Sequence, residues 1–326
     1  MTGPTGAPGF ATQPLEVGQY SHPGRKRARN EDWLGAFQPE SPKRLATKGS
    51  LFLVADGMGG HRSGEIASRR AVDQVIRAYM HDPTSDVAAS LHRAIRSANA
   101  SLYETAASEQ TGARWGTTLV AAVVRRDELW VANVGDSRAY LLRDRQLQRL
   151  SRDHSWGGEA AVAMGENWIG RHVITRALGS RPEIEVDVYP PRNLRPGDRI
   201  ILCTDGLTGP LDEGAIGEIV RRYPPQRAAE QLVRAANERD APDNVSVIVV
   251  NISGVWGWDL ERQASQSGSS RAGMLFHLVG RGKFGALRQA IAQDRQLLVI
   301  LVLALLVAAI VLVGLGFAAG LVFWGG

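Results

Sequence analysis

Helical segments occur in consecutive pairs between runs of strand, and this order constrains the fold of the 326-residue chain more than any other feature. Residues 63–80 and 85–107 carry helical periodicity one after the other, and residues 212–222 and 225–239 form a second pair. Asp212 is expected to cap the third of these helices. A parallel sheet would need strands that alternate with single helices. The paired order instead predicts antiparallel sheets flanked by helical hairpins.

Seven short runs predict strands, because several alternate in polarity or are rich in β-branched residues. They are 33–37, 51–56, 117–124, 128–135, 137–143, 199–205 and 244–251. Arg126-Asp127 and Asp144-Arg145 are expected to form tight reversals between neighbouring strands, as in an antiparallel meander. The predicted class is therefore α+β, a sandwich of β-sheets covered by helices on both faces.

The chain divides by composition into four segments. Residues 1–14 are rich in Gly, Pro and Thr and are expected to be a disordered lead, whereas residues 15–253 are expected to form one compact domain. Residues 254–296 combine a flexible linker with a basic stretch. Residues 297–324 are 28 consecutive uncharged residues. As a helix they would extend about 42 Å, more than the roughly 30 Å hydrocarbon core of a bilayer, and they predict one transmembrane helix.

The charge pattern suggests an orientation for this helix. Arg281, Lys283, Arg288 and Arg295 precede the apolar run. Because positive residues favour the cytoplasmic side, we expect a single-pass protein of the cell membrane whose domain 15–253 is cytoplasmic. The first thirty residues contain no apolar run, so no signal peptide is expected.

Two function classes are disfavoured by composition. The net charge of +5 resides in the flanks, where residues 21–48 hold seven Lys or Arg against three acids and residues 254–296 hold six against three. A nucleic-acid-binding domain would carry a basic stripe on its fold, so no nucleic acid partner is expected. Cys203 is the only cysteine, which excludes an internal disulfide and a cysteine-based zinc site.

Acidic residues recur at the ends of the predicted strands. Asp56 ends one strand and precedes Gly57, Asp136 and Asp205 end two others, and Asp243 precedes a fourth. Asn30-Glu31-Asp32 precedes a fifth. Any one Asp-Gly pair at a strand end is typical of a turn. Five such positions in one chain instead predict that the acids converge at one rim of the sheets.

Clustered carboxylates need cations, because burial of unneutralised like charges costs several kcal/mol. An all-oxygen ligand set without Cys or paired His favours hard ions such as Mg²⁺ or Mn²⁺. Two such ions about 4 Å apart would bridge a hydroxide and bind a phosphoryl group. Arg27, just before the acids, has a planar fork that suits a phosphate dianion, although within RKRAR it also fits a solvated charge.

Eight motifs occur in one order along residues 15–252, and together they resemble the metal-dependent protein phosphatase family, the type 2C serine/threonine phosphatases, especially the bacterial branch. The motifs are RARNED (27–32), VADGMGGHRSGEIAS (54–68), WGTTLVAAVV (115–124), VANVGDSRAYLLR (131–143), RDHS (152–155), ITRALG (174–179), ILCTDGLTGPL (201–211) and DNVSVIVV (243–250). The resemblance implies a four-layer αββα fold, with two antiparallel sheets between pairs of helices.

The resemblance also implies a set of metal ligands. Asp56 would bridge two Mn²⁺ or Mg²⁺ ions, and Gly57 would offer its carbonyl to one of them. Asp205 and Asp243 would bind the other ion, and Asp136 would bind a third, weaker ion.

Further roles follow from the same resemblance. Glu31 and Asp32 would hold metal-bound waters, Arg27 would bind the substrate phosphate, and Asn244 would orient Asp243. The implied reaction is single-step hydrolysis of phosphoserine or phosphothreonine in proteins, in which a bridging hydroxide attacks phosphorus in line and no phospho-enzyme forms. Phosphorylated proteins are the expected partners, with membrane Ser/Thr kinases and their substrates as candidates that the enzyme would counteract.

Two positions depart from the family pattern. Met58 stands where many eukaryotic relatives have a His proposed as general acid, so the proton donor stays open between His61, His154, His172 and a metal-bound water. Residues 156–171 (WGGEAAVAMGENWIGR) occupy the place of the flap beside the active site but lack its usual sequence.

Other phosphate-handling functions fit the sequence less well than a metal-dependent phosphatase. Cys203 has no Arg six residues later, so the loop of the cysteine phosphatases is absent, and no GxxxxGK[ST] motif is present. A catalytically silent scaffold that binds phosphoproteins remains the alternative. Such a relative usually lacks an acid at the position of Asp56, Asp205 or Asp243, and all three are present here.

Overall fold

The computed structural model of the protein describes residues 15–59, 63–108, 115–156 and 173–254. The predicted lead, the linker beyond residue 254 and the apolar run 297–324 fall outside these ranges. Among the described helices, none combines the length and apolar composition needed to cross a bilayer. All described residues belong to one unit, Met1–Trp258.

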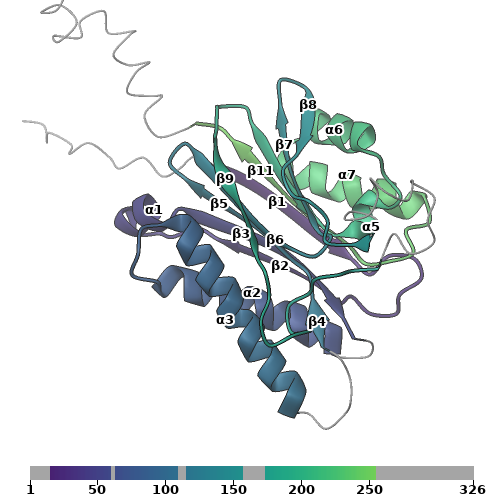
Figure 1. The fold of residues 1–326 in the computed structure, drawn as a ribbon. Helices are drawn as coiled ribbons and strands as arrows, with labels where there is room; N and C mark the ends of the chain where they lie inside the picture. The colour runs from purple at the N-terminus through teal and green to yellow at the C-terminus, as the bar shows by residue number, and fades with distance from the viewer. Residues whose placement is uncertain (1–14, 60–62, 109–114, 157–172, 255–326) are drawn as a thin grey trace, which may run out of the picture. The chain divides into compact units, whose positions relative to one another are not determined.

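Two antiparallel sheets form the centre of this unit (Figure 1). The first has the strand order β1-β11-β10-β7-β8 and comprises β1 (Leu15–His22), β7 (Arg138–Arg143), β8 (Gln146–Arg149), β10 (Arg199–Cys203) and β11 (Val245–Ile252). The second has the order β2-β3-β5-β6-β9 and comprises β2 (Asp32–Phe37), β3 (Ser50–Met58), β5 (Leu119–Arg125), β6 (Glu128–Val134) and β9 (Asp187–Asn193). The two-residue strand β4 (Gly116–Thr117) pairs with the end of β3.

Helix pairs cover the outer faces of the sheets, on opposite sides of the sandwich (Figure 1). The helices α2 (Ser63–His81) and α3 (Val87–Ser108) share one apolar cluster with the second sheet. The helices α6 (Glu213–Arg222) and α7 (Pro225–Glu238) share another with the first sheet. A third cluster lies between the sheets. The predicted αββα sandwich is therefore confirmed, with two short helices, α1 (Pro42–Lys48) and α5 (Asp205–Thr208), between strands.

The predicted helix cap and the two predicted tight reversals are confirmed. The Asp212 side chain accepts a hydrogen bond of 2.8 Å from the Ala215 N–H and so caps α6. The reversals at 126–127 and 144–145 join β5 to β6 and β7 to β8. Arg126, Asp144 and Arg145 adopt positive φ angles of 59°, 48° and 69° there.

Three strands were not predicted from the sequence, and each lies at the edge of a sheet. β1 and β8 are the two edges of the first sheet, and β9 is an edge of the second. Edge strands bury less side-chain surface, so their apolar alternation is weak, and β9 even contains Pro190 and Pro191. The prediction of a strand to residue 205 also needs correction, because β10 ends at Cys203 and Asp205 begins α5.

Candidate active site

One open pocket of about 620 Å³ collects segments that are far apart in the chain. Its lining comprises Arg27, Ala28, Arg29, Glu31, Asp56, Gly57, Met58, Gly59, Ile174, Asp205, Asp243 and Asn244. Seven of the nine residues predicted for the site are in this set, and the other two, Asp32 and Asp136, are buried outside the lining. The expected convergence of strand-end acids at one rim therefore occurs.

The β2–β3 ladder places two of the acids face to face. Asp32 begins β2 and is the direct register partner of Asp56 near the end of β3. Asp32 is 4% exposed, and its Oδ2 accepts a hydrogen bond of 3.0 Å from the Thr204 hydroxyl. The Thr204 Oγ1 in turn accepts a hydrogen bond of 3.0 Å from the Ser246 N–H. These contacts join the second sheet to β10 and β11 of the first.

The backbone of Asp56 is held by two threonines that precede β5. Its N–H donates to Thr118 Oγ1 at 3.0 Å, and its carbonyl accepts from the Thr118 N–H at 2.9 Å. The Thr117 hydroxyl donates to the same carbonyl at 2.8 Å. Asp56 therefore enters the pocket from a fixed stretch of backbone.

Glycine makes the floor of the pocket possible. A Cβ on Gly57 would lie 2.1 Å from the Gly64 carbonyl oxygen. A Cβ on Gly64 would lie 2.7 Å from Glu31 Oε2 and 2.9 Å from the Gly57 carbonyl oxygen. The Glu31 backbone carbonyl accepts from the Gly57 N–H at 3.1 Å and from the Ser68 hydroxyl at 2.6 Å. The first turn of α2 is thus packed directly against the Glu31 segment.

Arg27 and Asp243 contact each other across the pocket. An Arg27 Nη2–H donates to Asp243 Oδ2 at 2.8 Å, and the Asn244 backbone N–H donates to Asp243 Oδ1 at 2.9 Å. The Asn244 side chain does not contact Asp243. Its Oδ1 accepts from the Glu31 N–H at 2.8 Å, and its Nδ2 donates to the backbone carbonyls of residues 23 and 29. The expected orientation of Asp243 by Asn244 therefore uses the backbone, while the side chain holds the Arg27 segment in place.

Burial raises the pKa of Asp56, Asp32 and Asp136, and the charges of neighbouring acids add to the effect. Burial, followed by the charges of Asp32, Asp205, Asp243 and Asp136, raises the pKa of Asp56 well above its usual value. Burial raises the pKa of Asp32 to about 7, and Asp205 and Asp243 add to this effect. Burial raises the pKa of Asp136 to about 7, with further contributions from Asp205 and Asp153. The carboxylates thus form one electrostatically coupled group.

The donor chemistry of this group fits hard divalent cations. Asp32 Oδ1 and Asp136 Oδ1 are buried without a hydrogen-bond partner, as expected of oxygens that need a cation or its water. In the described part of the chain, however, no three acidic, histidine or cysteine side chains lie close enough together to hold an ion as they stand. Asp243 directs both carboxylate oxygens at protein donors. Ion binding by Asp56, Asp205 and Asp243 would therefore require the Arg27–Asp243 contact to be exchanged for the ion.

Of the three candidate proton-donor histidines, only His154 lies in the described part of the chain, and it does not line the pocket. His154 is fully buried and absent from the lining. Its Nδ1 accepts from the Gly135 N–H at 3.2 Å, and its Nε2 lies 3.2 Å from Asp187 Oδ2. His154 is therefore a structural histidine beside the β6–β7 connection, which corrects its place among the candidates. His61, His172 and residues 157–171 of the predicted flap lie outside the described residues, whereas Met58 lines the pocket.

Sequence reasoning missed the hydroxyl groups that support the acids. The hydroxyls of Thr117, Thr118 and Thr204 bond to Asp56 or Asp32, and the backbone N–H of Ser246 donates to the Thr204 hydroxyl. All four lie in or beside buried strands, where an uncharged hydroxyl is a weak signal. Their position within the quoted motifs is the only signal that could have found them.

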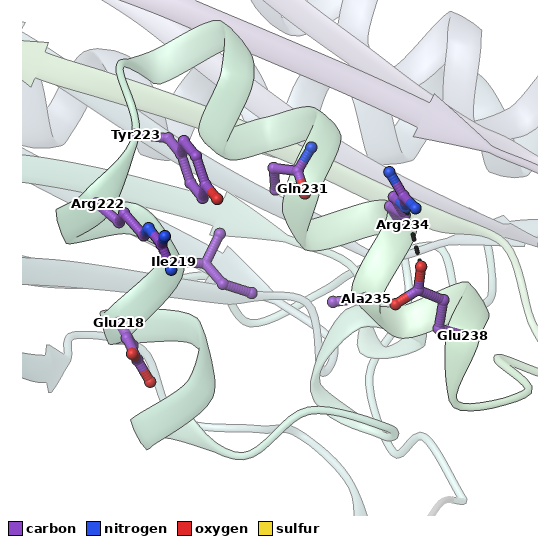
Figure 2. A pocket seen from close by; sticks show the side chains of 8 residues that line it. All are labelled: Glu218, Ile219, Arg222, Tyr223, Gln231, Arg234, Ala235 and Glu238. Atoms are coloured by element: carbon purple, nitrogen blue, oxygen red, sulfur yellow. Dashed lines mark hydrogen bonds and ion pairs between the residues drawn. The ribbon is translucent and has the colours of Figure 1, made fainter.

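A second hollow lies between α6 and α7, with a volume of about 140 Å³ (Figure 2). Its charged side chains include Arg234 and Glu238, which form an ion pair at 2.9 Å within α7. None of the acids discussed above lines it. The chemistry of a phosphoryl site is therefore concentrated in the larger pocket.

Similarity to known proteins covers the region of the chain that carries the pocket residues. A family model described as protein phosphatase 2C matches residues 27–245. Serine/threonine phosphatase stp of Listeria monocytogenes is 33% identical over 238 residues, which cover 70% of this chain and 92% of that protein. Serine/threonine protein phosphatase PstP of Mycobacterium tuberculosis is 31% identical over 244 residues, covering 73% of this chain and 45% of PstP.

Solved structures give the same relationship. The crystal structure of the M. tuberculosis phosphatase PstP/Ppp superposes with a TM-score of 0.64 at 32% identity, covering 73% of this chain and 98% of that chain. The catalytic domain of PstP in complex with two manganese ions has a TM-score of 0.63 at 32% identity, with coverages of 73% and 97%.

Proposed function

The chain belongs to the protein phosphatase 2C family and is a serine/threonine protein phosphatase of the bacterial type, and from this premise we propose how its own residues work. It hydrolyses phosphoserine or phosphothreonine in proteins with the help of two Mn²⁺ or Mg²⁺ ions held in the large pocket. The observation that carries the proposal is the convergence there of Asp56, Asp205 and Asp243 with Arg27. These residues come from segments up to 216 residues apart.

Carboxylates and one backbone carbonyl would hold the ions. Asp56, the Gly57 carbonyl, Asp205 and Asp243 would hold the two ions, and Asp136 would hold a third, weaker ion. When bound, the ions would neutralise the acids, polarise the phosphoryl group and lower the pKa of a water. The raised pKa of Asp56 supports this assignment, because it reflects burial of the carboxyl group and, after burial, the negative charge of neighbouring acids, which bound cations would balance.

The remaining residues of the pocket act on the substrate and on water. Arg27 would release Asp243 and bind the phosphate through its guanidinium fork. Glu31 and Asp32 would accept hydrogen bonds from water and so orient it. Water attacks phosphorus in line, the new O–P bond replaces the ester bond, and the serine or threonine oxygen leaves and takes up a proton. Met58, at the wall of the pocket, has no proton to donate, so this proton would come from water.

Phosphate release from a phosphothreonine peptide by the full chain tests the proposal. We expect Mn²⁺-dependent release that EDTA abolishes and that Asp205→Ala lowers by at least about a hundredfold. Asp73→Ala, which removes an exposed acid from α2, is the matched control and should retain activity. Binding of the peptide without phosphate release would instead establish the silent scaffold. Activity that persists in EDTA would contradict the role of the metal.

We further propose that residues 297–324 anchor the enzyme in the cell membrane, with the catalytic domain in the cytoplasm. The proposal is supported by the 28 uncharged residues and by the basic residues that precede them. Leu306→Arg/Ile310→Arg in the full chain should move the protein from the carbonate-resistant membrane pellet to the supernatant. Gln263→Arg/Gln266→Arg adds the same charge in the linker and should leave it in the pellet.

Anchoring would concentrate the enzyme near membrane-bound phosphoproteins, so we propose that it counteracts membrane Ser/Thr kinases. The same Leu306→Arg/Ile310→Arg variant provides the test, because it keeps the pocket intact. Phosphosites on such kinases should rise in cells that carry this variant, while activity on a soluble peptide stays unchanged. Unaltered phosphosite levels would count against this role.

A further inference from the structure

Three exposed cations stand beside the catalytic pocket and form no ion pair with any residue that the structure describes. Arg25, Lys26 and Arg29 flank Arg27 in the segment before β2, and all three are exposed. Arg27 pairs with Asp243, but none of the three has an ion pair with any described residue. Arg29 also lines the pocket itself. Positive charge is therefore concentrated at the rim of a pocket whose interior is acidic.

The segment that carries these cations is held in a defined conformation. It begins at Gly24, which has a φ of +79° and where an added Cβ would lie 2.0 Å from the Asp243 carbonyl oxygen. The Arg25 N–H donates to the Ala241 carbonyl at 3.0 Å, and its Nε donates to the Asn237 carbonyl at 3.2 Å. At the other end, Asn244 Nδ2 donates to the Arg29 carbonyl at 2.8 Å. The segment is therefore attached at one end to the C-terminal end of α7 and Ala241, and at the other end to Asn244, directly before β11.

The chemistry of the rim indicates what it would contact. A phosphorylated side chain that reaches Arg27 must place its neighbouring residues over this segment, because Arg27 lies between the other cations in sequence. Carboxylates on those neighbours would meet guanidinium and ammonium groups that form no ion pair with a described residue. An anionic membrane surface would satisfy the same charges, but the position of Arg29 in the pocket lining favours the substrate.

We propose that Arg25, Lys26 and Arg29 form a cationic rim that selects phosphoproteins with acidic residues next to the phosphorylated serine or threonine. The inference rests on the proposed phosphatase function and adds its substrate preference. Exposed charge pairs contribute up to about fivefold in affinity each, so three of them give a preference of about tenfold or more. The effect should weaken with salt, because these charges are exposed to solvent.

Two phosphothreonine peptides test the rim, one flanked by Asp and Glu and the other by Asn and Gln at the same positions. The measured quantity is the ratio of their kcat/KM values with the full Mn²⁺-loaded chain. We expect a ratio of about 10 at low salt that approaches 1 in about 1 M NaCl, where the screening length is about 3 Å. Arg25→Gln/Lys26→Gln and Arg29→Gln should each lower the ratio by at least about threefold, chiefly through KM of the acidic peptide.

Arg221→Gln/Arg222→Gln is the charge-matched control. Both residues are exposed at the end of α6, and the neighbouring Tyr223 carbonyl accepts from Arg199 at the start of β10, the opposite end of that strand from Asp205. The ratio of the two kcat/KM values should be the same for this control as for the unaltered chain. A kcat/KM ratio near 1 in the unaltered chain, or an equal fall of the ratio in the control, would overturn the proposed substrate preference. Hydrolysis of the neutral peptide would still uphold the phosphatase function in that case. Failure to hydrolyse either peptide would overturn the function itself.

Discussion

Asp32 and Asp56 lie directly opposite each other on the neighbouring antiparallel strands β2 and β3. Like charges in direct register destabilise a sheet, and Asp32 is also buried at 4% exposure. The pair therefore lowers the stability of the metal-free fold. A site that binds divalent cations gives a reason for the pair, because a cation converts the repulsion into attraction.

This relationship predicts that Asp32→Asn stabilises the metal-free protein. Removal of one charge should raise the free energy of unfolding in EDTA at about pH 8 by about 1 kcal/mol, because the isosteric amide no longer repels Asp56. The unaltered protein should gain about 3 kcal/mol from Mn²⁺ at a hundredfold excess over Kd, and the variant should gain less. Urea unfolding with and without Mn²⁺ measures both quantities. Asp73→Asn, at an exposed position, is the control, and a less stable Asp32→Asn protein in EDTA would refute the argument.

The Arg27–Asp243 contact of 2.8 Å predicts opposite effects on metal and substrate. Arg27→Ala should tighten Mn²⁺ binding several-fold, because Asp243 loses its protein partner and a nearby cation is removed. The same variant should lower kcat/KM by about a hundredfold or more, since the phosphate loses its guanidinium. Titration calorimetry and peptide kinetics provide the measurements. Arg29→Ala removes the same charge without the Asp243 contact, and an equal gain in metal affinity there would show that the contact is irrelevant.

The close packing at Gly64 predicts that even one methyl group impairs the site. Gly64→Ala would place its Cβ 2.7 Å from Glu31 Oε2 and 2.9 Å from the Gly57 carbonyl oxygen, so both must move. We expect Mn²⁺ affinity and kcat/KM to fall by at least about tenfold each. Gly217→Ala is the matched helical control, because its Cβ would meet only Leu147 Cβ at an ordinary 3.5 Å. That control should stabilise α6 by up to about 1 kcal/mol, and equal activity in the two variants would contradict the prediction.

The contact between Asp82 and Arg93 predicts that the stability of the fold depends on pH, independently of the active site. The hydrogen bonds from the Arg93 guanidinium hold the pKa of Asp82 at about 2, below the value of about 4 expected in the unfolded chain. This carboxylate therefore stabilises the fold above about pH 4, and its contribution is lost as the pH falls from about 4 to about 2. Asp82→Asn should cost about 1–2 kcal/mol at pH 7, discounted for the exposure of Arg93. In urea unfolding, the difference from the unaltered protein should shrink below pH 4, and a constant difference would exclude this origin.

Cys203 is predicted to be unreactive in the native protein. The residue is fully buried in β10, and burial raises the pKa of its thiol to about 12. Iodoacetamide should therefore leave phosphatase activity intact, because the thiolate is rarer by roughly a thousandfold than for an ordinary cysteine. One thiol per chain should become reactive only when denaturant unfolds the protein. Rapid labelling with loss of activity before unfolding would contradict this assignment.

Helices and central strands were predictable from the sequence because burial imposes a pattern on them. In α7, Ala229, Leu232, Val233 and Ala236 recur at helical spacing and are all buried against the first sheet. The strands β3, β5 and β11 are apolar on both faces because each packs between layers. The edge strands β1, β8 and β9 escaped prediction because one side of each faces no neighbouring strand, so their sequences carry a weaker pattern.

The residues of the site could be predicted from the sequence, but the contacts between them could not. Asp56, Asp205, Asp243 and Arg27 could be named because acids at strand ends, in the order of the quoted motifs, are an unusual pattern. Thr204 could not be named, since a single hydroxyl beside a strand is common. Its role becomes visible only in the folded protein, where the Thr204 hydroxyl, directly after β10, reaches Asp32 at the start of β2 across 172 residues of sequence.

Composition, periodicity and motif order by themselves determined the class of fold, the family resemblance and the list of acids, because each depends on which residue types occur and at what spacing. The tertiary structure alone decided which groups touch. It placed Asp32 opposite Asp56, paired Asp243 with Arg27, buried His154 outside the pocket lining and left Arg25, Lys26 and Arg29 without an ion pair to any described residue. The physical reason is that contact distances depend on strand register and on the packing of one sheet against the other, and neither is encoded in any local stretch of the chain.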